Sequence, residues 1–228
     1  MRRRFWSIGI SVLAILALLL LLSMESCYMA DSRALRALKS DSVTVEETDF
    51  GWRFDGPAED TALIFYPGAK VDAAAYAPLL HRLAQDRMDV FLVKMPLHFA
   101  VLGIHRAARI LERYDYENWY IGGHSLGGVA AVYYAAERDM QGVVLLASYP
   151  TRAIEEPMLQ IYGTEDGVLN LKKAEAADDY GTVERVLLPG ANHSGFGNYG
   201  AQAGDRAPRI SPEEQQEETA AAIVSWLP

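Results

Sequence analysis

The feature that most restricts the fold of this chain is the sequence Gly-His-Ser-Leu-Gly at positions 123–127. The apolar run 119–122 before it predicts a strand, and residues 129–137 after it predict a helix. A G-x-S-x-G motif at such a turn holds the serine in a strained conformation that exposes its hydroxyl above the sheet edge. Glycine is needed on both sides because larger side chains would collide with the neighbouring strand and helix. Ser125 is therefore the candidate nucleophile, and a glycine-rich turn that buries its serine is the alternative.

The rest of the chain predicts an α/β domain, because apolar runs of strand length alternate with helical patterns. The expected strands are residues 43–48 and 52–55, as a hairpin, and then 61–66, 89–93, 142–146, 158–162 and 183–188. The expected helices are residues 73–85, 100–114 and 211–227, and the last has Ser211 as N-cap, Pro212 in its first turn and Glu214 in a capping box. Only eleven residues, 147–157, connect two late strands, too few for a lid domain. The expected fold is a mostly parallel sheet flanked by helices over residues 43–228.

The N-terminal segment predicts a membrane anchor over residues 1–27. Three arginines at positions 2–4 precede twenty uncharged, mostly apolar residues, 5–24. Such a helix spans roughly 30 Å, the thickness of a hydrocarbon core. The arginines favour a cytoplasmic N-terminus, which places the rest of the chain outside. A cleaved signal peptide and a secreted product are the alternative, although residues 23–27 offer no convincing cleavage site. The polar residues 28–42 are expected to be a linker.

Charge and cysteine content narrow the choice of partners and cofactors. The formal net charge is −9 although three basic residues stand at the N-terminus, so the remaining surface is strongly acidic. An acidic surface repels phosphate backbones, which argues against nucleic acid as a partner. Cys27 is the sole cysteine, so an intrachain disulfide is impossible, and no Cys/His pattern has metal-ligand spacing. We expect a domain that uses no metal and no cofactor.

The order of these segments resembles the α/β-hydrolase superfamily. The strand–Gly-His-Ser-Leu-Gly-Gly–helix unit carries the resemblance. Residues 66–72 (Tyr-Pro-Gly-Ala-Lys-Val-Asp) and 192–197 (Asn-His-Ser-Gly-Phe-Gly) are similar to small, lid-less bacterial members of the dienelactone-hydrolase-like, fold-5 type. The resemblance covers residues 43–228 and implies a hydrolase with a catalytic triad. Dienelactone hydrolases use a cysteine nucleophile where this chain has Ser125, so the resemblance does not carry their substrate over.

A serine hydroxyl needs a base, and in this fold the base follows the last strand. His193 alone among the histidines follows residues 183–188, within a glycine-rich loop. The others fall in expected helices, after an early strand or inside the serine motif: His81, His105, His98 and His124. We therefore expect His193 to be the base, and a loop histidine that caps a backbone group is the alternative.

The acid of the triad should follow the strand at 158–162, where Glu165 and Asp166 are adjacent. Position alone leaves both open. The resemblance implies the second carboxylate of a Gly-x-x-Asp turn, so Asp166 is the expected partner of His193. Asp178 and Asp179 are the next candidates.

The oxyanion hole should combine the Leu126 N–H with an N–H from the loop after the strand at 61–66. Pro67 has no N–H to donate. Ala69 is therefore the expected second donor, with Gly68 as the alternate.

The glycine-rich loop 192–210 is unusually long for its position. Its residues Phe196, Tyr199 and Gln202 are candidates for lining a substrate pocket, and a plain surface loop is the alternative. Together these features predict a membrane-tethered, extracytoplasmic serine esterase that acts on small esters, lactones or thioesters. A catalytically silent binding protein is the alternative of another class, although a silent member would usually have lost a triad residue. An acyltransferase or a peptidase would use the same triad.

Overall fold

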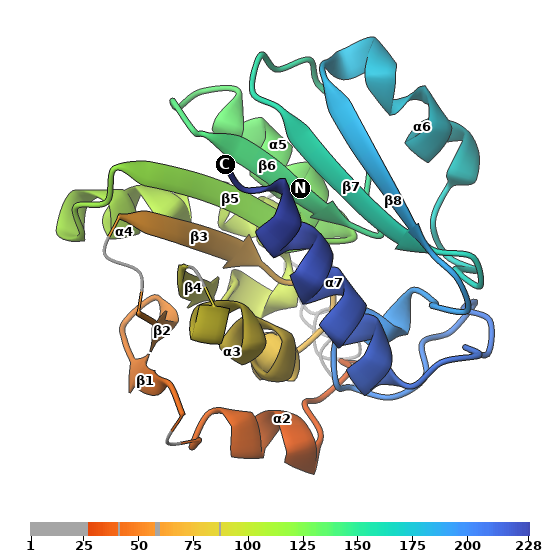
Figure 1. The fold of residues 1–228 in the computed structure, drawn as a ribbon, viewed down its shortest axis with the longest axis horizontal. Coiled ribbons are helices and arrows are strands. Elements are labelled where there is room, and N and C mark those ends of the chain that lie inside the picture. The colour runs from red at the N-terminus through yellow and green to blue at the C-terminus, as the bar shows by residue number, and fades with distance from the viewer. Residues whose placement is uncertain (1–26, 41, 58–59, 87) are drawn as a thin grey trace, which may run out of the picture.

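An eight-stranded sheet forms the centre of the molecule in the computed structural model, which describes residues 27–40, 42–57, 60–86 and 88–228 (Figure 1). The strand order is β1-β2-β4-β3-β5-β6-β7-β8. The first two pairings, β1 with β2 and β2 with β4, are antiparallel and all others are parallel. The strands are β1 Thr44–Glu47, β2 Gly51–Asp55, β3 Thr61–Tyr66, β4 Asp89–Val93, β5 Asn118–His124, β6 Gly142–Leu146, β7 Met158–Gly163 and β8 Val183–Leu188. This arrangement confirms the predicted opening hairpin and the mostly parallel sheet.

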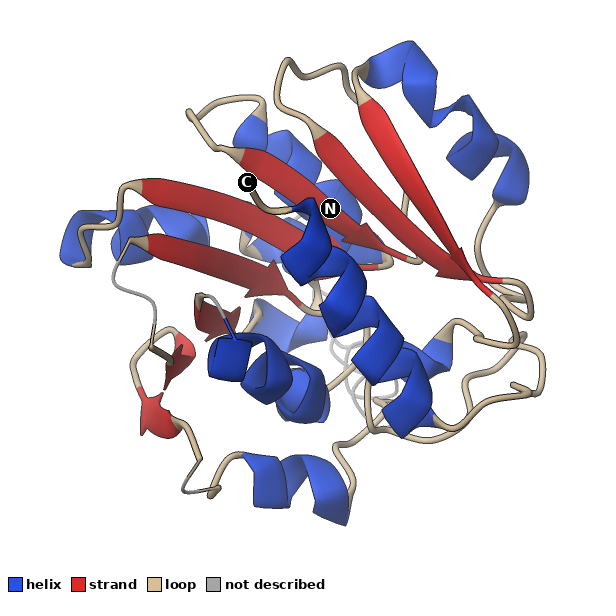
Figure 2. Ribbon diagram, in the orientation of Figure 1, coloured by secondary structure: helices blue, strands red, loops and turns tan. Residues whose placement is uncertain are grey.

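Helices cover both faces of the sheet, as the colours of Figure 2 show. The α-helices are α2 Ser32–Ala37, α3 Ala77–Asp86, α4 Ala107–Arg113, α5 Leu126–Ala135, α6 Leu171–Glu175 and α7 Pro212–Trp226. Short 3-10 helices are η1 Ala73–Tyr76, η2 Pro96–His98, η3 Ala100–Leu102, η4 Ile104–Arg106, η5 Ala176–Tyr180 and η6 Ser194–Phe196. In Figure 1, α3 and α7 cross the near face of the sheet and α5 lies behind it.

Alternate residues of β3 supply the two hydrophobic cores. Leu63 and Phe65 pack with side chains of α3 and α7, whereas Ile64 packs with residues of α4 and α5. Side chains of successive strand residues point to opposite faces, so a strand that is buried on both sides is apolar throughout. Burying each such side chain contributes roughly 1.5–3 kcal/mol. The uninterrupted apolar run of β3 therefore fixes this strand in the middle of the sheet.

Two expected helices begin or break at places that local chemistry explains. Residues 73–85 divide into η1 and α3, and Pro78 lies in the first turn of α3, where its missing N–H is tolerated. Residues 100–114 were expected to form one helix, but η3 and η4 precede α4 instead. Gly103 separates η3 from η4, and a Cβ there would lie 2.8 Å from the Met95 sulfur. A larger residue there would force the Met95 side chain to move, and glycine is itself a poor helix former.

The segment 28–42, expected to be a linker, packs against the domain. Asp31 caps α2 by accepting from the N–H groups of Arg33 and Ala34, at 2.8 and 2.9 Å. The Tyr28 N–H donates to the Lys70 carbonyl at 2.7 Å, and Ala34 is fully buried. Because the segment is mostly polar, its sequence did not indicate these few contacts. The packed domain therefore begins at or before Tyr28.

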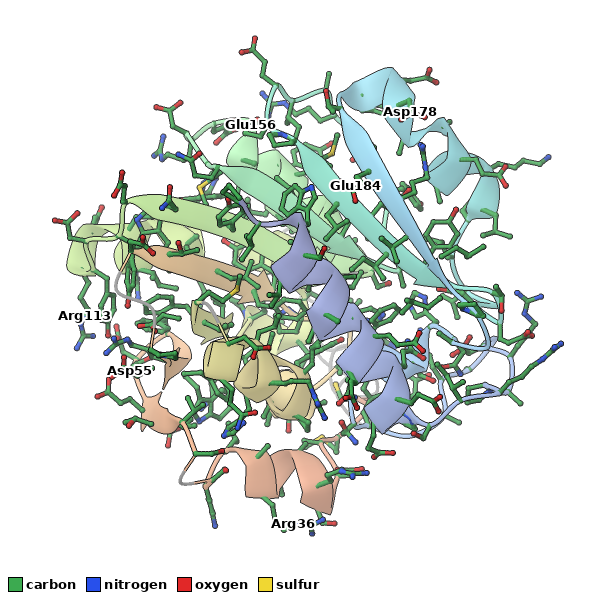
Figure 3. The ribbon with its side chains drawn as sticks, viewed as in Figure 1. Arg36, Asp55, Arg113, Glu156, Asp178 and Glu184 are labelled. Atoms are coloured by element: carbon green, nitrogen blue, oxygen red, sulfur yellow. The ribbon has the colours of Figure 1, made fainter. Side chains whose placement is uncertain are left out.

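The expected anchor, residues 1–27, lies outside the described residues apart from Cys27. Within the described ranges, no helix is both long and apolar enough to cross a membrane. Figure 3 labels charged side chains at the surface of the domain, among them Arg113 at the end of α4 and Asp178 of η5, which pairs with Arg185 at 2.8 Å.

Candidate active site

The turn between β5 and α5 has the backbone geometry that the serine motif predicts. Ser125 has φ 52° and ψ −121°, a conformation that costs a non-glycine residue about 1–3 kcal/mol. Two hydrogen bonds hold it there: the Ser125 N–H donates to the Leu146 carbonyl at 2.9 Å, and the Ser148 hydroxyl donates to the Ser125 carbonyl at 2.7 Å. Both partners follow or end β6, so the sheet itself fixes the serine.

The flanking glycines are required by close packing of the backbone. A Cβ on Gly123 would lie 2.5 Å from the Gly127 carbonyl carbon, and one on Gly127 would lie 2.2 Å from the Tyr66 carbonyl oxygen. Neither approach is possible for a real side chain, and the opposing atoms are main chain that cannot rotate away. The structure thus confirms the reason for which the motif was expected to need glycine.

His193 and Asp166 form a buried pair on the loops after β8 and β7. The Nδ1 atom of His193 lies 2.9 Å from Asp166 Oδ2 and 3.2 Å from Oδ1, and both side chains are buried. The same carboxylate accepts from the N–H groups of Val168 and Leu169, at 2.9 and 2.8 Å. Because the carboxylate can only accept, Nδ1 carries the proton and Nε2 is left as the basic nitrogen. The structure therefore brings together the two side chains that the sequence paired.

Ser125 and His193 line one cavity of about 190 Å³. His193 Nε2 is buried and has no hydrogen-bond partner among the described residues, so the Ser125 hydroxyl is not bonded to it here. In structures without substrate the bond between base and nucleophile is often long and tightens only when substrate binds. The other lining residues are Leu126, Val129, Ala147, Ser148, Tyr149, Val168, Leu169 and Asn170.

His124, inside the serine motif, points away from the cavity and into the core. Its Nδ1 lies 2.8 Å from the Tyr76 hydroxyl and its Nε2 lies 3.1 Å from the His193 carbonyl oxygen. Complete burial lowers the pKa of His124 well below its ordinary value, and the nearby His193 lowers it further. A neutral ring whose Nε2–H donates to the His193 carbonyl fits these contacts. His124 therefore helps to fix the main chain of His193 through this hydrogen bond.

The N–H groups of the two expected oxyanion donors are free to bind an oxyanion. Neither the Leu126 N–H nor the Ala69 N–H has a hydrogen-bond partner among the residues that the structure describes. The Gly68 N–H, in contrast, donates to the Tyr76 hydroxyl at 3.1 Å. The observation favours Ala69 over Gly68, and both assignments stay predictions.

The remaining carboxylate and the other histidines lie elsewhere. Glu165 accepts from Arg209 at 3.1 Å and does not contact His193. His81 packs edge-on against Phe54, and His105 is largely exposed. Across the described residues, no group of three or more His, Cys, Asp or Glu side chains is arranged to hold a metal ion.

The loop 192–210 contributes His193 to the Ser125 cavity, but none of the three candidates Phe196, Tyr199 and Gln202 lines it. Phe196 and Tyr199 belong to the core next to α7, because both rings are apolar and the loop folds back over the sheet. Gln202 accepts from the Tyr199 hydroxyl at 3.0 Å and borders a separate cavity of about 480 Å³. The residues that do line the Ser125 cavity follow the ends of β6 and β7, such as Tyr149 and Val168. Their position just after those strands was the signal that could have identified them.

Comparison with known proteins agrees with this geometry. The alpha/beta hydrolase family model matches residues 62–217. No curated protein matches the sequence. Among solved structures, the chain resembles Est1E from Butyrivibrio proteoclasticus with a TM-score of 0.57 and 14% identity, over 80% of this chain and 98% of that one. It resembles a dienelactone hydrolase from Anabaena variabilis with a TM-score of 0.61 and 15% identity, over 82% and 100%.

A third similar structure is a bacterial membrane phospholipase A, with a TM-score of 0.61 and 13% identity over 99% of both chains. At these identities the solved structures establish the fold alone. The family model covers more than half of the chain and matches the part that contains Ser125, Asp166 and His193. The chain belongs to the alpha/beta hydrolase family.

Proposed function

We propose that this protein is a serine esterase in which Ser125 attacks the substrate, His193 is the base and Asp166 orients the base. The observation that carries the proposal is the shared cavity. Ser125, held in a strained turn, faces the same space as a histidine whose Nδ1 is bound by a buried carboxylate. The unpartnered Nε2 of His193 is then the atom that accepts the serine proton.

The reaction follows from this arrangement in two steps. In the first, Ser125 Oγ bonds to the carbonyl carbon of the ester while its proton passes to His193 Nε2, and the carbonyl oxygen becomes an oxyanion. The N–H groups of Leu126 and Ala69 are the proposed donors to that oxyanion. The intermediate collapses, and the alkoxide leaves with the proton from Nε2. In the second step a water oxygen bonds to the acyl carbon while one of its protons passes to Nε2. The bond from that carbon to Ser125 Oγ then breaks, Oγ takes the proton back from Nε2, and the acid is released.

The cavity suits short, neutral acyl groups. Its volume of about 190 Å³ lies below the roughly 300–1,000 Å³ of sites that enclose drug-sized ligands. No Asp, Glu, Lys or Arg is among the described residues that line it, and Val129, Val168 and Leu169 supply apolar surface. Small esters, lactones or thioesters are therefore the proposed substrates.

Hydrolysis of a series of p-nitrophenyl esters tests this proposal. Acetate and butyrate should be cleaved with higher kcat/KM than octanoate and decanoate. Ser125→Ala and His193→Ala should each lower kcat by several orders of magnitude. Normal turnover by Ser125→Ala would contradict the proposed nucleophile, and preference for the longest esters would contradict only the proposed substrate size.

We also propose that residues 1–27 anchor the chain in a membrane with the hydrolase domain outside the cytoplasm. The support is the run of twenty uncharged residues after three arginines.

A further inference from the structure

The loop that follows His193 returns to the loop that carries Asp166. A Cβ on Gly167 would lie 2.6 Å from the Gly204 carbonyl oxygen and 2.9 Å from the Arg206 nitrogen, so the two loops are in direct contact. Residues 192–210 form this return, and apart from the short η6 they contain no helix or strand. Their shape therefore depends on side-chain hydrogen bonds.

The Asp205 carboxylate connects the base to the acid loop. Its Oδ1 accepts from the N–H of Gly167 at 3.1 Å, next to Asp166, and from the N–H of His193 itself at 3.2 Å. Its Oδ2 accepts from the N–H and the hydroxyl of Ser194, at 2.8 and 3.0 Å. Partial burial by itself would raise the pKa of Asp205, but these N–H donors hold the pKa below its ordinary value. The carboxylate thus stays charged and keeps all its acceptor sites.

Arg206 binds the other side of the acid loop. Its guanidinium donates to three consecutive carbonyl oxygens: Thr164 at 2.9 Å, Glu165 at 3.2 Å and Asp166 at 2.7 Å. The rigid planar fork of arginine suits several acceptors at fixed spacing, which lysine cannot match. In turn, Asn192, the residue before His193, donates through its side chain to the Arg206 carbonyl at 2.8 Å.

We propose that Asp205 and Arg206 are positioning residues that clamp the His193 loop to the Asp166 loop and so set the geometry of the catalytic pair. The inference rests on the proposed function, because it assigns a role only to residues that act through His193 and Asp166. It gives the part of the 192–210 loop beyond His193 a function without requiring it to touch substrate. A misplacement of about 1 Å in such a pair lowers turnover roughly 10²-fold.

The clamp predicts that losing it affects kcat more than KM. Asp205→Ala and Arg206→Ala should lower kcat by about 10- to 100-fold and change KM for a short ester little, because neither residue lines the Ser125 cavity. Asp205→Asn keeps one acceptor oxygen and Arg206→Lys keeps the charge, so both should recover part of kcat. Arg209→Ala is the matched control, since Arg209 pairs with the Glu165 side chain and is mostly exposed. It should keep normal turnover.

A double-mutant cycle separates positioning from general destabilisation. Asp205→Ala should lower turnover about 10- to 100-fold in the wild-type background but have little effect on the residual turnover of His193→Ala, since the group it positions is absent. Melting temperature and circular dichroism identify unfolded variants, for which Asp205→Asn takes the place of Asp205→Ala. Normal kcat in a folded Asp205→Ala, or an equal loss in both backgrounds, would overturn the clamp alone. Normal turnover by His193→Ala would overturn the proposed mechanism and the clamp with it.

Discussion

Ser125 adopts positive φ because hydrogen bonds from both sides of its peptide leave no alternative. His193 is held in a comparable way, by Asp166 at its ring and by His124 and Asp205 at its backbone. The conformations of Ser125 and His193 thus depend on hydrogen bonds to a few named side chains and main-chain groups. Conservative substitutions at these positions therefore report on the role of each residue.

Asp166 and Glu165 are adjacent, but only Asp166 contacts His193. Asp166→Asn should lower kcat by up to about 10⁴-fold. Without the carboxylate, the neutral imidazole is no longer held in the tautomer with its proton on Nδ1, and the imidazolium formed during the reaction has no negative partner. Glu165→Gln removes only an ion pair with an exposed arginine and should keep most activity. Steady-state kinetics on p-nitrophenyl acetate compares the two. The reverse order of activities would move the acid to Glu165.

His124 gives the free energy of unfolding a dependence on pH. Burial lowers its pKa well below the ordinary value of 6.5, so below that pH the unfolded chain binds a proton that the folded chain does not. Its contribution is complete above pH 6.5 and is lost as the pH falls, by about 1.4 kcal/mol per pH unit. The free energy of unfolding of His124→Asn should decline less steeply between pH 6.5 and 5.5. Urea unfolding at both pH values measures this, and equal slopes would show that His124 does not titrate as inferred.

At the scale of elements, much of the sheet could be predicted because buried parallel strands are continuous apolar runs. The expected strands at 61–66 and 183–188 match β3 and β8, and the serine motif was placed correctly between β5 and α5. The Ser211 side chain accepts from the Glu214 N–H at 3.2 Å, as expected for the cap of α7. The break at Gly103 was missed, although a glycine inside an expected helix is itself a signal for it.

The turn that carries Ser125 depends on the missing side chain at Gly127. Gly127→Ala should destabilise the fold and abolish ester hydrolysis, because the new Cβ would lie 2.2 Å from the Tyr66 carbonyl oxygen. Gly200→Ala is a control with open space around it but φ +82°, so it should lose only about 1–2 kcal/mol and keep its activity. Thermal unfolding and ester kinetics test both variants. A stable, active Gly127→Ala would refute the packing argument for the motif.

At the scale of the whole molecule, the order of the loops along one sheet edge assembles the site. The strands β5, β6, β7 and β8 are adjacent and parallel, so the residues that follow them meet. This rule allowed Ser125, His193 and the adjacent pair Glu165 and Asp166 to be proposed from the sequence, and the family resemblance then selected Asp166. It could not predict Asp205 or Arg206, because most of their partners are main-chain atoms that any sequence supplies. The packing of residues 28–40 was missed for a similar reason, since backbone contacts hold Tyr28.

The proposed anchor predicts how the whole chain behaves in cells. The protein should stay with membranes after high-salt and alkaline washing and require detergent for extraction. Protease added to intact cells should digest the hydrolase domain. A variant without residues 1–24 should be extracted without detergent and keep its esterase activity, because Ser125, Asp166 and His193 all lie in the hydrolase domain. Full-length protein in the soluble cytoplasmic fraction would contradict the anchor.

The central claim is that Ser125 is a nucleophile activated by His193. The most direct measurement is mass spectrometry of the protein after reaction with a fluorophosphonate, whose phosphorus bonds to the serine oxygen as fluoride leaves. The account predicts one adduct, on the peptide that contains Ser125, absent in Ser125→Ala and formed orders of magnitude more slowly in His193→Ala. An adduct on another residue, or none in folded protein that hydrolyses esters, would contradict the account.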